Sequence, residues 1–243
     1  MVAENKNEFR KRDLFLTGGL WLISLILPDP HLPYRKEFLK KRDFVYLGVL
    51  VLLPVIWPGA LFLMGLAGIY AIVALGLSLF LGYAGQISLG HAAFFGIGAY
   101  TTAILTTRYG IPPVGAFWAS AGAAAACAYL IGKPILKLKG YFLALATLGF
   151  GEIFLVIVRE ARDLTGGVSG IFGVPWFSVA GFTFDTYLKQ YCLIWGVLIG
   201  LVLFAKNLVR SKMGRALLAV AASEDAAASV GIDVARVKLG VFV

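Results

Sequence analysis

The chain of 243 residues is 60% hydrophobic and only 14% charged, with a mean hydropathy of +0.86. A soluble domain is about half apolar and a quarter charged, so this composition argues against one and predicts a protein that crosses the membrane several times. The formal net charge is +9, but the basic residues lie between apolar runs. That placement argues against nucleic-acid binding and is typical of loops at the cytoplasmic surface of a membrane.

Residues 1–42 form a basic segment that contains one short apolar run, 14–27. The run is shorter than the ~20 residues of a perpendicular span, and its flanks do not match a signal-peptide cleavage site. We expect a tilted or interfacial segment there. Five of the eight residues in 35–42 are basic, which predicts a cytoplasmic loop.

Residues 43–205 are predicted to form a transmembrane helical domain. Proline and glycine are the strongest breaks in apolar sequence, and they divide this region at 54–59 and at later loops. The fold class is therefore all-α, a polytopic transmembrane bundle of about six apolar segments. The expected helices cover 44–57, 60–82, 86–107, 114–132, 141–158 and 187–205.

Small residues recur at every fourth position of the helix 114–132: Ala116, Ser120, Ala124, Ala128 and Gly132. Two helices can approach closely along such a stripe. We expect it to serve packing.

The positions of lysine and arginine predict the orientation. If 206–238 is cytoplasmic and the spans alternate, the three inner loops hold 14 basic residues and the outer connections hold four. Residues 239–243 then begin a further span. The basic N-terminal tail agrees with this topology only if 14–27 does not cross.

Polar residues interrupt the apolar sequence most strongly at 82–100, where Gln86, Ser88 and His91 lie among many glycines. Polar groups at membrane depth need partners in protein or water, so these three residues are candidates for a translocation path. On a helix starting at residue 86, one face would carry Ser88, His91, Phe95, Gly98 and Thr102. Alternatively, His91 bonds a neighbouring carbonyl and only fixes packing. The glycines indicate close approach of a backbone or a ligand, and both remain open.

Glu152 is a further candidate for the path, because a carboxylate in an apolar span usually faces the bundle interior and has a partner. Arg159 follows seven residues later on the same helical face, and His91 could reach Glu152 from another helix. A buried structural ion pair is the alternative.

The segment 211–233 is rich in alanine and acids and is predicted to be a short cytoplasmic helix closed by Gly231 at the C′ position. Such a helix makes little core of its own, and its small face suits a groove on another protein. A solvated connecting helix is the alternative.

Motifs of common enzymes are absent from the sequence. It contains no GxxxxGK[ST] phosphate loop, no HExxH and no GxSxG. With only two histidines, His31 and His91, it predicts no metal centre. Cys127 and Cys192 lie in apolar runs and are expected to be small buried residues. We expect a protein without an ATPase site of its own and without a cofactor.

Three ordered blocks carry a family resemblance. They are GYAGQISLGHAAFFGIGAYTTAIL (82–105), KGYFLALATLGFGEI with TGGVSGI (139–153 and 165–171), and SKMGRALLAVAASEDAAASVGIDVARVKLGVFV (211–243). These blocks resemble the branched-chain amino-acid ABC permeases, specifically the M-type subunit of the Liv system. The resemblance runs from about residue 60 to the end.

The resemblance implies the permease of an importer in a bacterial or archaeal cell membrane. An extracytoplasmic solute-binding protein would deliver Leu, Ile, Val or a related solute to a heterodimer of permease subunits, driven by two cytoplasmic ATP-binding subunits. The third block is similar to the family's "EAA" loop, which contacts the ATPases. The coupling residues would be Gly214, Arg215, Glu224, Asp225, Ala226, Ala227 and Gly231. Ala221 and Ala222 depart from the family pattern, which often has charged residues there.

Other readings remain open. Family members continue through further spans after the coupling loop, so we expect this sequence to be a fragment or a truncated gene product. The similar urea and short-amide permeases share all three blocks and are an alternative for the solute. A non-transporting membrane scaffold is the alternative of another class.

Overall fold

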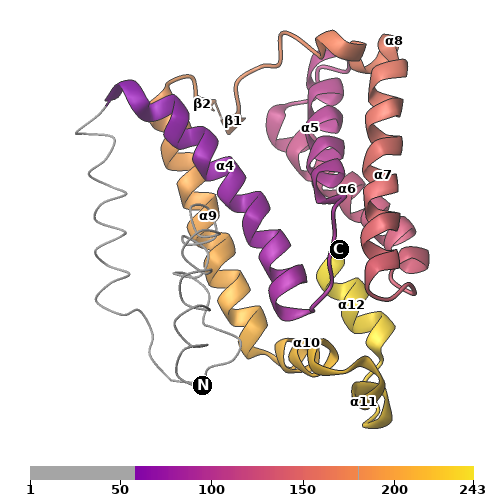
Figure 1. The fold of residues 1–243 in the computed structure, drawn as a ribbon. Coiled ribbons are helices and arrows are strands. Elements are labelled where there is room, and N and C mark those ends of the chain that lie inside the picture. Colours follow the sequence, from indigo (N-terminus) through magenta and orange to yellow (C-terminus); the bar gives the residue numbers. More distant parts are fainter. Residues whose placement is uncertain (1–57, 180) are drawn as a thin grey trace, which may run out of the picture. The chain divides into compact units, whose positions relative to one another are not determined.

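The computed structural model describes residues 58–179 and 181–243 (Figure 1). The predicted segments 14–27, 35–42 and 44–57 lie outside the described residues. The chain divides into two units, Met1–Ala60 and Leu61–Val243, and the helical bundle belongs to the second unit.

Helices make up most of the described chain, with only two short strands beside them, which confirms the predicted all-α fold. In chain order the elements are η1 (Pro58–Ala60), α4 (Leu61–Ser78), the π-helical turn η2 (Leu79–Tyr83), α5 (His91–Thr107), α6 (Pro113–Ile135), α7 (Tyr141–Glu160), α8 (Arg162–Thr165), η3 (Gly167–Ser169), β1 (Ser178–Val179), β2 (Phe182–Thr183), α9 (Tyr187–Arg210), α10 (Lys212–Ala222), α11 (Glu224–Ser229) and α12 (Val234–Phe242). The two short strands pair antiparallel, with Ser178 opposite Thr183.

Four of the described helices are long and apolar enough to cross a membrane: α4 with η2 (Leu61–Tyr83), α6, α7 and α9. Together they confirm the prediction of a multi-pass membrane protein. Helix α5 has 17 residues, which at 1.5 Å per residue is about 25 Å and shorter than the ~30 Å hydrocarbon layer.

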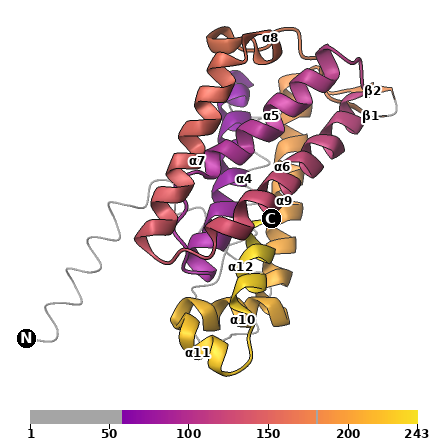
Figure 2. The same cartoon turned by 90° about the vertical axis from the view of Figure 1, so that its right-hand side faces the viewer.

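The helices alternate in direction, so that alternate connections meet at opposite ends of the bundle. At one end, the α6–α7 loop contacts α11 through Lys139 Nζ and Asp225 Oδ1, 3.0 Å apart. At the other end, the rings of Phe117 in α6 and Phe177, the residue before β1, lie 6.2 Å apart. Figure 1 and Figure 2 both place α10 and α11 at the end away from α8.

Helices α4 and α9 pack side by side (Figure 1). Gly65 and Gly68 are buried on α4, and a Cβ on Gly68 would lie 2.7 Å from Ile194 Cγ2. Trp195 Nε1 donates a hydrogen bond to the Met64 carbonyl at 3.2 Å. Glycine therefore permits the close contact that brings this indole to the α4 backbone.

The small-residue stripe of α6 is packed as predicted. Ala116, Ser120, Ala128 and Gly132 are buried and Ala124 is half-buried, where α6 meets α5 and α12. A Cβ on Gly132 would lie 2.8 Å from Phe242 Cδ1, so the stripe makes room for an α12 ring.

The start of α5 differs from the prediction. The helix begins at His91 and not at residue 86, and residues 84–90 form an irregular, non-helical connection from η2 to α5 (Figure 1). Gly85 has a φ of +65°, a conformation that ends a helix and favours glycine. We call residues 84–90 the linking segment.

Three further differences concern 159–238. Helix α9 continues to Arg210 instead of ending at residue 205. The single helix expected in 211–233 is two helices, α10 and α11, separated at Ser223. The β1–β2 pair within 178–183 was not predicted.

Candidate functional site

The two short helices that follow α9 each begin with a serine cap. The Ser211 side chain accepts hydrogen bonds from Met213 N at 3.1 Å and Gly214 N at 3.4 Å. Ser223 accepts one from Ala226 N at 3.3 Å. These bonds satisfy amide groups that a helix start leaves without partners, so the sequence itself defines where α10 and α11 begin.

Gly214 lies at the corner between α9 and α10, where a side chain has no room. It is buried, and a Cβ there would lie 2.0 Å from the Val209 carbonyl oxygen. Its neighbour Arg215 is exposed and donates to the Arg210 carbonyl at 3.4 Å. Gly214 thus sets the direction in which α10 leaves α9.

Helix α11 ends in a Schellman motif, with Gly231 at the C′ position as predicted. Gly231 has a φ of +85°. Its N–H donates to the Ala228 carbonyl at 3.0 Å, and the N–H of Ile232 donates to the Ala227 carbonyl at 3.1 Å. This pair of bonds closes the last turn of the helix.

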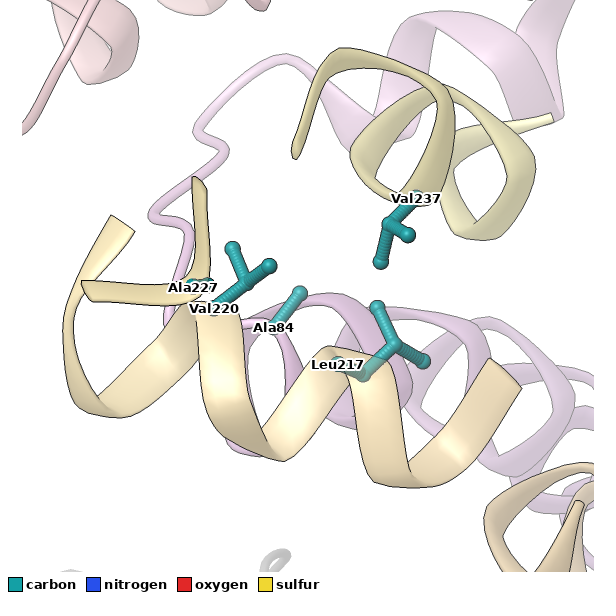
Figure 3. Close-up of a cluster of buried hydrophobic side chains, with 5 residues drawn as sticks. All are labelled: Ala84, Leu217, Val220, Ala227 and Val237. Atoms are coloured by element: carbon teal, nitrogen blue, oxygen red, sulfur yellow. The ribbon is translucent and has the colours of Figure 1, made fainter. Parts of the chain in front are cut away.

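A small apolar cluster holds α10, α11 and α12 together (Figure 3). Its buried members are Ala84, Leu217, Val220, Ala227 and Val237. Four of them come from the three helices, and Ala84 comes from the linking segment. The linking segment is therefore part of the core of this corner of the molecule.

A polar network lies beside the apolar cluster. The ammonium group of Lys238, on α12, lies 2.5 Å from Glu224 Oε1, and the Lys238 side chain is only 1% exposed. Gln86 Nε2 donates to the same carboxylate oxygen at 3.3 Å and to the Ala84 carbonyl at 3.1 Å. We call Gln86, Glu224 and Lys238 the Glu224 network.

Sequence reasoning singled out Gln86 and Glu224 separately and missed Lys238. The one available signal was a lone lysine between Val237 and Leu239 at the start of an apolar run. A lysine in that setting is rarely buried without a carboxylate partner.

The two adjacent acids of α11 face different surroundings. Glu224 is half-buried in its network, whereas the Asp225 side chain is 91% exposed and pairs with Lys139. Because Lys139 donates a hydrogen bond to Asp225, the pKa of Lys139 lies above the ordinary lysine value. Ala226 is exposed and Ala227 is buried, so α11 has one face on the bundle and one free face.

The far end of the linking segment lies against α7. Leu89 N–H donates to Thr147 Oγ1 at 3.0 Å, and a Cβ on Gly90 would lie 2.0 Å from the Thr147 carbonyl oxygen. At its near end, a Cβ on Gly85 would lie 3.3 Å from Ala221 Cβ. Gly85 and Gly90 thus serve close approach to other parts of the chain, one of the two interpretations that the sequence leaves open.

Ser88 and His91 lie at the start of α5 but not on one helical face, because Ser88 precedes the helix. The Ser88 hydroxyl is buried and has no hydrogen-bond partner among the described residues. His91 is half-buried, and its Nε2 lies 3.2 Å from the Cβ position of Gly76 on α4. His91 therefore faces the contact between α4 and α5.

Glu152 lies on the exposed side of α7 in the described chain, and its place beside a translocation path stays a prediction. The inward face of α7 carries Leu143, Ala144 and Thr147, and Glu152 lies about 140° around the helix from Thr147. Among the described residues, no ion pair or hydrogen bond joins it to His91 or Arg159. Within the same residues, no group of metal-ligating side chains occurs.

Residues 59–243 match the family model described as "Branched-chain amino acid transport system / permease component". The chain is 35% identical to the "High-affinity branched-chain amino acid transport system permease protein LivM" of Escherichia coli (strain K12) and 33% identical to the protein of the same description from Salmonella typhimurium. Each alignment covers 83% of this chain and 54% of the relative, so the chain spans about half the length of these curated relatives. No solved structure matches it significantly.

Proposed function

Since this chain belongs to the family of branched-chain amino acid transport system permease components, we propose that it is the membrane-spanning permease subunit of an ATP-driven ABC importer. Its solute is a branched-chain or related amino acid, delivered by an extracytoplasmic binding protein. Separate ATP-binding subunits supply the energy. A second permease subunit completes the membrane part as a heterodimer.

The observation that carries this proposal is the free face of α11. Asp225, Ala226 and Val230 are exposed there, and the Val230 side chain is 75% exposed. Short side chains on a capped helix suit insertion into a groove on another protein. We propose that this face docks on an ATP-binding subunit and that Asp225, Ala226 and Gly231 form the contact.

The other coupling candidates have supporting roles in this proposal. Gly214 and Arg215 set the corner from which α10 departs, Ala227 packs α11 on the bundle, and Glu224 binds inward to Lys238. Residues 206–238 form the coupling loop and 43–205 the transmembrane domain. Six basic residues in 206–238 favour a cytoplasmic position for the loop, in the plasma membrane of a bacterium or archaeon.

For the translocation path we propose Ser88 and His91 at the start of α5, together with Glu152 on α7. His91 begins α5 and Ser88 lies in the non-helical connection before it, an arrangement that membrane proteins tolerate where it is covered by protein or lines a cavity. A carboxylate on an apolar helix needs a partner or water, which supports a place for Glu152 beside the path. Gln86, the fourth path candidate, contributes through the Glu224 network.

Reconstitution tests the proposal. The complex that co-purifies with the tagged chain is placed in liposomes, and ATP hydrolysis is measured with and without the binding protein. We expect the binding protein to stimulate hydrolysis and radiolabelled leucine to accumulate. If urea or acetamide reduces leucine uptake and isoleucine and valine do not, the solute would belong to the amide class. A complex that neither hydrolyses ATP nor accumulates solute would favour a scaffold.

A further inference from the structure

We propose that Lys238 is a positioning residue for energy coupling. Together with Glu224 and Gln86, it fastens α11 to the linking segment, so that a displacement of α11 is carried to the start of α5 and to α7. This inference rests on the proposed docking of α11 on an ATP-binding subunit.

The first support is the burial of a charge. The Lys238 side chain is 1% exposed and its ammonium group lies 2.5 Å from Glu224 Oε1. A buried charge is strongly disfavoured unless it is paired and hydrogen-bonded. Separating Glu224 from Lys238 would leave an uncompensated charge, so α11 and α12 are expected to move as one body.

The second support is the attachment of the linking segment to this body. Gln86 Nε2 donates to the Glu224 oxygen at 3.3 Å, and Ala84 is fully buried in the apolar cluster of α10–α12. A Cβ on Gly85 would lie 3.3 Å from Ala221 Cβ. Residues 84–86 are thus held by a polar contact and by packing at once.

The third support is the other end of the linking segment. Leu89 N–H is bonded to Thr147 Oγ1 at 3.0 Å, and Gly90 lies against the α7 backbone immediately before α5. Only Ile87 and Ser88 lie between Gln86 and Leu89. A displacement at Gln86 is therefore passed through a short connection to the contacts with α5 and α7.

The α10–α12 corner is connected to the other helices in two ways, through the chain from α10 to α9 and through its contacts with the linking segment. Helix α10 follows α9 directly through Ser211, so a movement of α10 acts on α9 and on α4, which packs against it. The Glu224 network instead acts on α5 and α7. One displacement of the α10–α12 corner can thus reach α5 and α7 as well as α9 and α4.

The test uses the reconstituted complex and the number of leucine molecules imported per ATP hydrolysed. Gln86→Met preserves the Lys238–Glu224 pair and removes its link to the linking segment. Coupling between two sites is typically worth about 5- to 150-fold, so we expect about tenfold less leucine per ATP with stimulated hydrolysis retained. Gln190→Met is the matched control, because Gln190 Nε2 also donates to a backbone carbonyl, that of Phe184 at 3.2 Å, in the α9 end away from α10.

Two further variants separate coupling from folding. The double variant Lys238→Met with Glu224→Met removes both charges together, a change that buried pairs often tolerate, and we expect it to assemble and to be uncoupled. Lys238→Arg keeps the charge and should retain coupling. An unchanged ratio of leucine to ATP in Gln86→Met or in the double variant would overturn the proposal.

Hydrogen exchange on the unmodified complex covers the case in which variants do not assemble. We expect ATP to alter the protection of amides in α11 and in 84–90 together. Altered protection in α11 with unchanged protection in 84–90 would overturn the proposal. Absence of binding-protein-stimulated hydrolysis in the unmodified complex would instead refute the proposed function, so the two failures are distinguishable.

Discussion

Gln86 Nε2 and Glu224 Oε1 lie 3.3 Å apart although 138 positions separate the two residues in the sequence. Gln86 belongs to the most polar stretch of the apolar region, and Glu224 begins the alanine-rich helix α11. Two features that the sequence presents separately therefore form one site. The polar stretch has two parts, one fastened to α10–α12 and one that starts α5.

Gly90 is predicted to be intolerant of any side chain. A Cβ there would lie 2.0 Å from the Thr147 carbonyl oxygen, and overpacking typically costs about 1–3 kcal/mol. We expect Gly90→Ala to lower the melting temperature of the purified chain in detergent. Gly98→Ala, within α5, is the control, because a Cβ there meets nothing within 4 Å. Equal melting temperatures for the two variants would contradict the contact with α7.

Gly231 is predicted to require a residue that adopts the left-handed conformation. Its φ is +85°, which costs roughly 1–2 kcal/mol for most residues and less for asparagine. We expect Gly231→Ala to lower leucine uptake per ATP and Gly231→Asn to retain most of it. The prediction fails if the two variants transport alike, because the end of α11 would then be unimportant.

Replacement of Glu152 is predicted to impair transport and to leave folding unchanged. The residue is exposed on α7, so Glu152→Leu should insert into the membrane normally and lose solute uptake. Glu160→Leu, also exposed and on the last turn of the same helix, is the control and should transport normally. Unimpaired uptake by Glu152→Leu would remove Glu152 from the path.

The Lys139–Asp225 pair is predicted to be unimportant for stability near neutral pH. The hydrogen bond to Asp225 raises the pKa of Lys139. Any stabilisation of the fold by the pair is therefore present below the ordinary lysine pKa, and it is lost only as the pH rises through the raised pKa of Lys139. Exposed pairs contribute little. We expect Lys139→Met to melt like the unmodified chain from about pH 6 to 9. A lower melting temperature in that range would show that the pair is structural.

Local signals in the sequence were sufficient for the starts of α6 and α7, although α6 continues past its predicted end at residue 132 to Ile135. Two prolines precede the body of α6 and a glycine with a φ of +57°, Gly140, precedes α7. Proline and glycine act on the backbone at their own positions, so they can be read without knowledge of the fold. The stripe of small residues on α6 could also be predicted, since it depends only on helical spacing.

The start of α5, the burial of Lys238 and the orientation of Glu152 could not be predicted. Each depends on a tertiary relationship: Gly90 against Thr147, Lys238 beside Glu224, and α7 packed by its Leu143 side. Gly85 and Gly90 bound residues 86–89, but a glycine is found both at helix ends and at close helix contacts, so the sequence alone does not identify the break. A carboxylate in an apolar helix indicates that a partner is needed without identifying which face will be covered.

The free face of α11 is the centre of the account, and site-specific photo-crosslinking tests it most directly. A photoreactive residue replaces Val230, which is 75% exposed beside α11, or Val168, which is 91% exposed in η3 at the opposite end. We predict that the Val230 position forms an adduct with an ATP-binding subunit, identified by its phosphate-loop peptide, and that the Val168 position does not. An ATP-hydrolysing complex in which the ATP-binding subunit crosslinks to the Val168 position and not to Val230 would contradict the account.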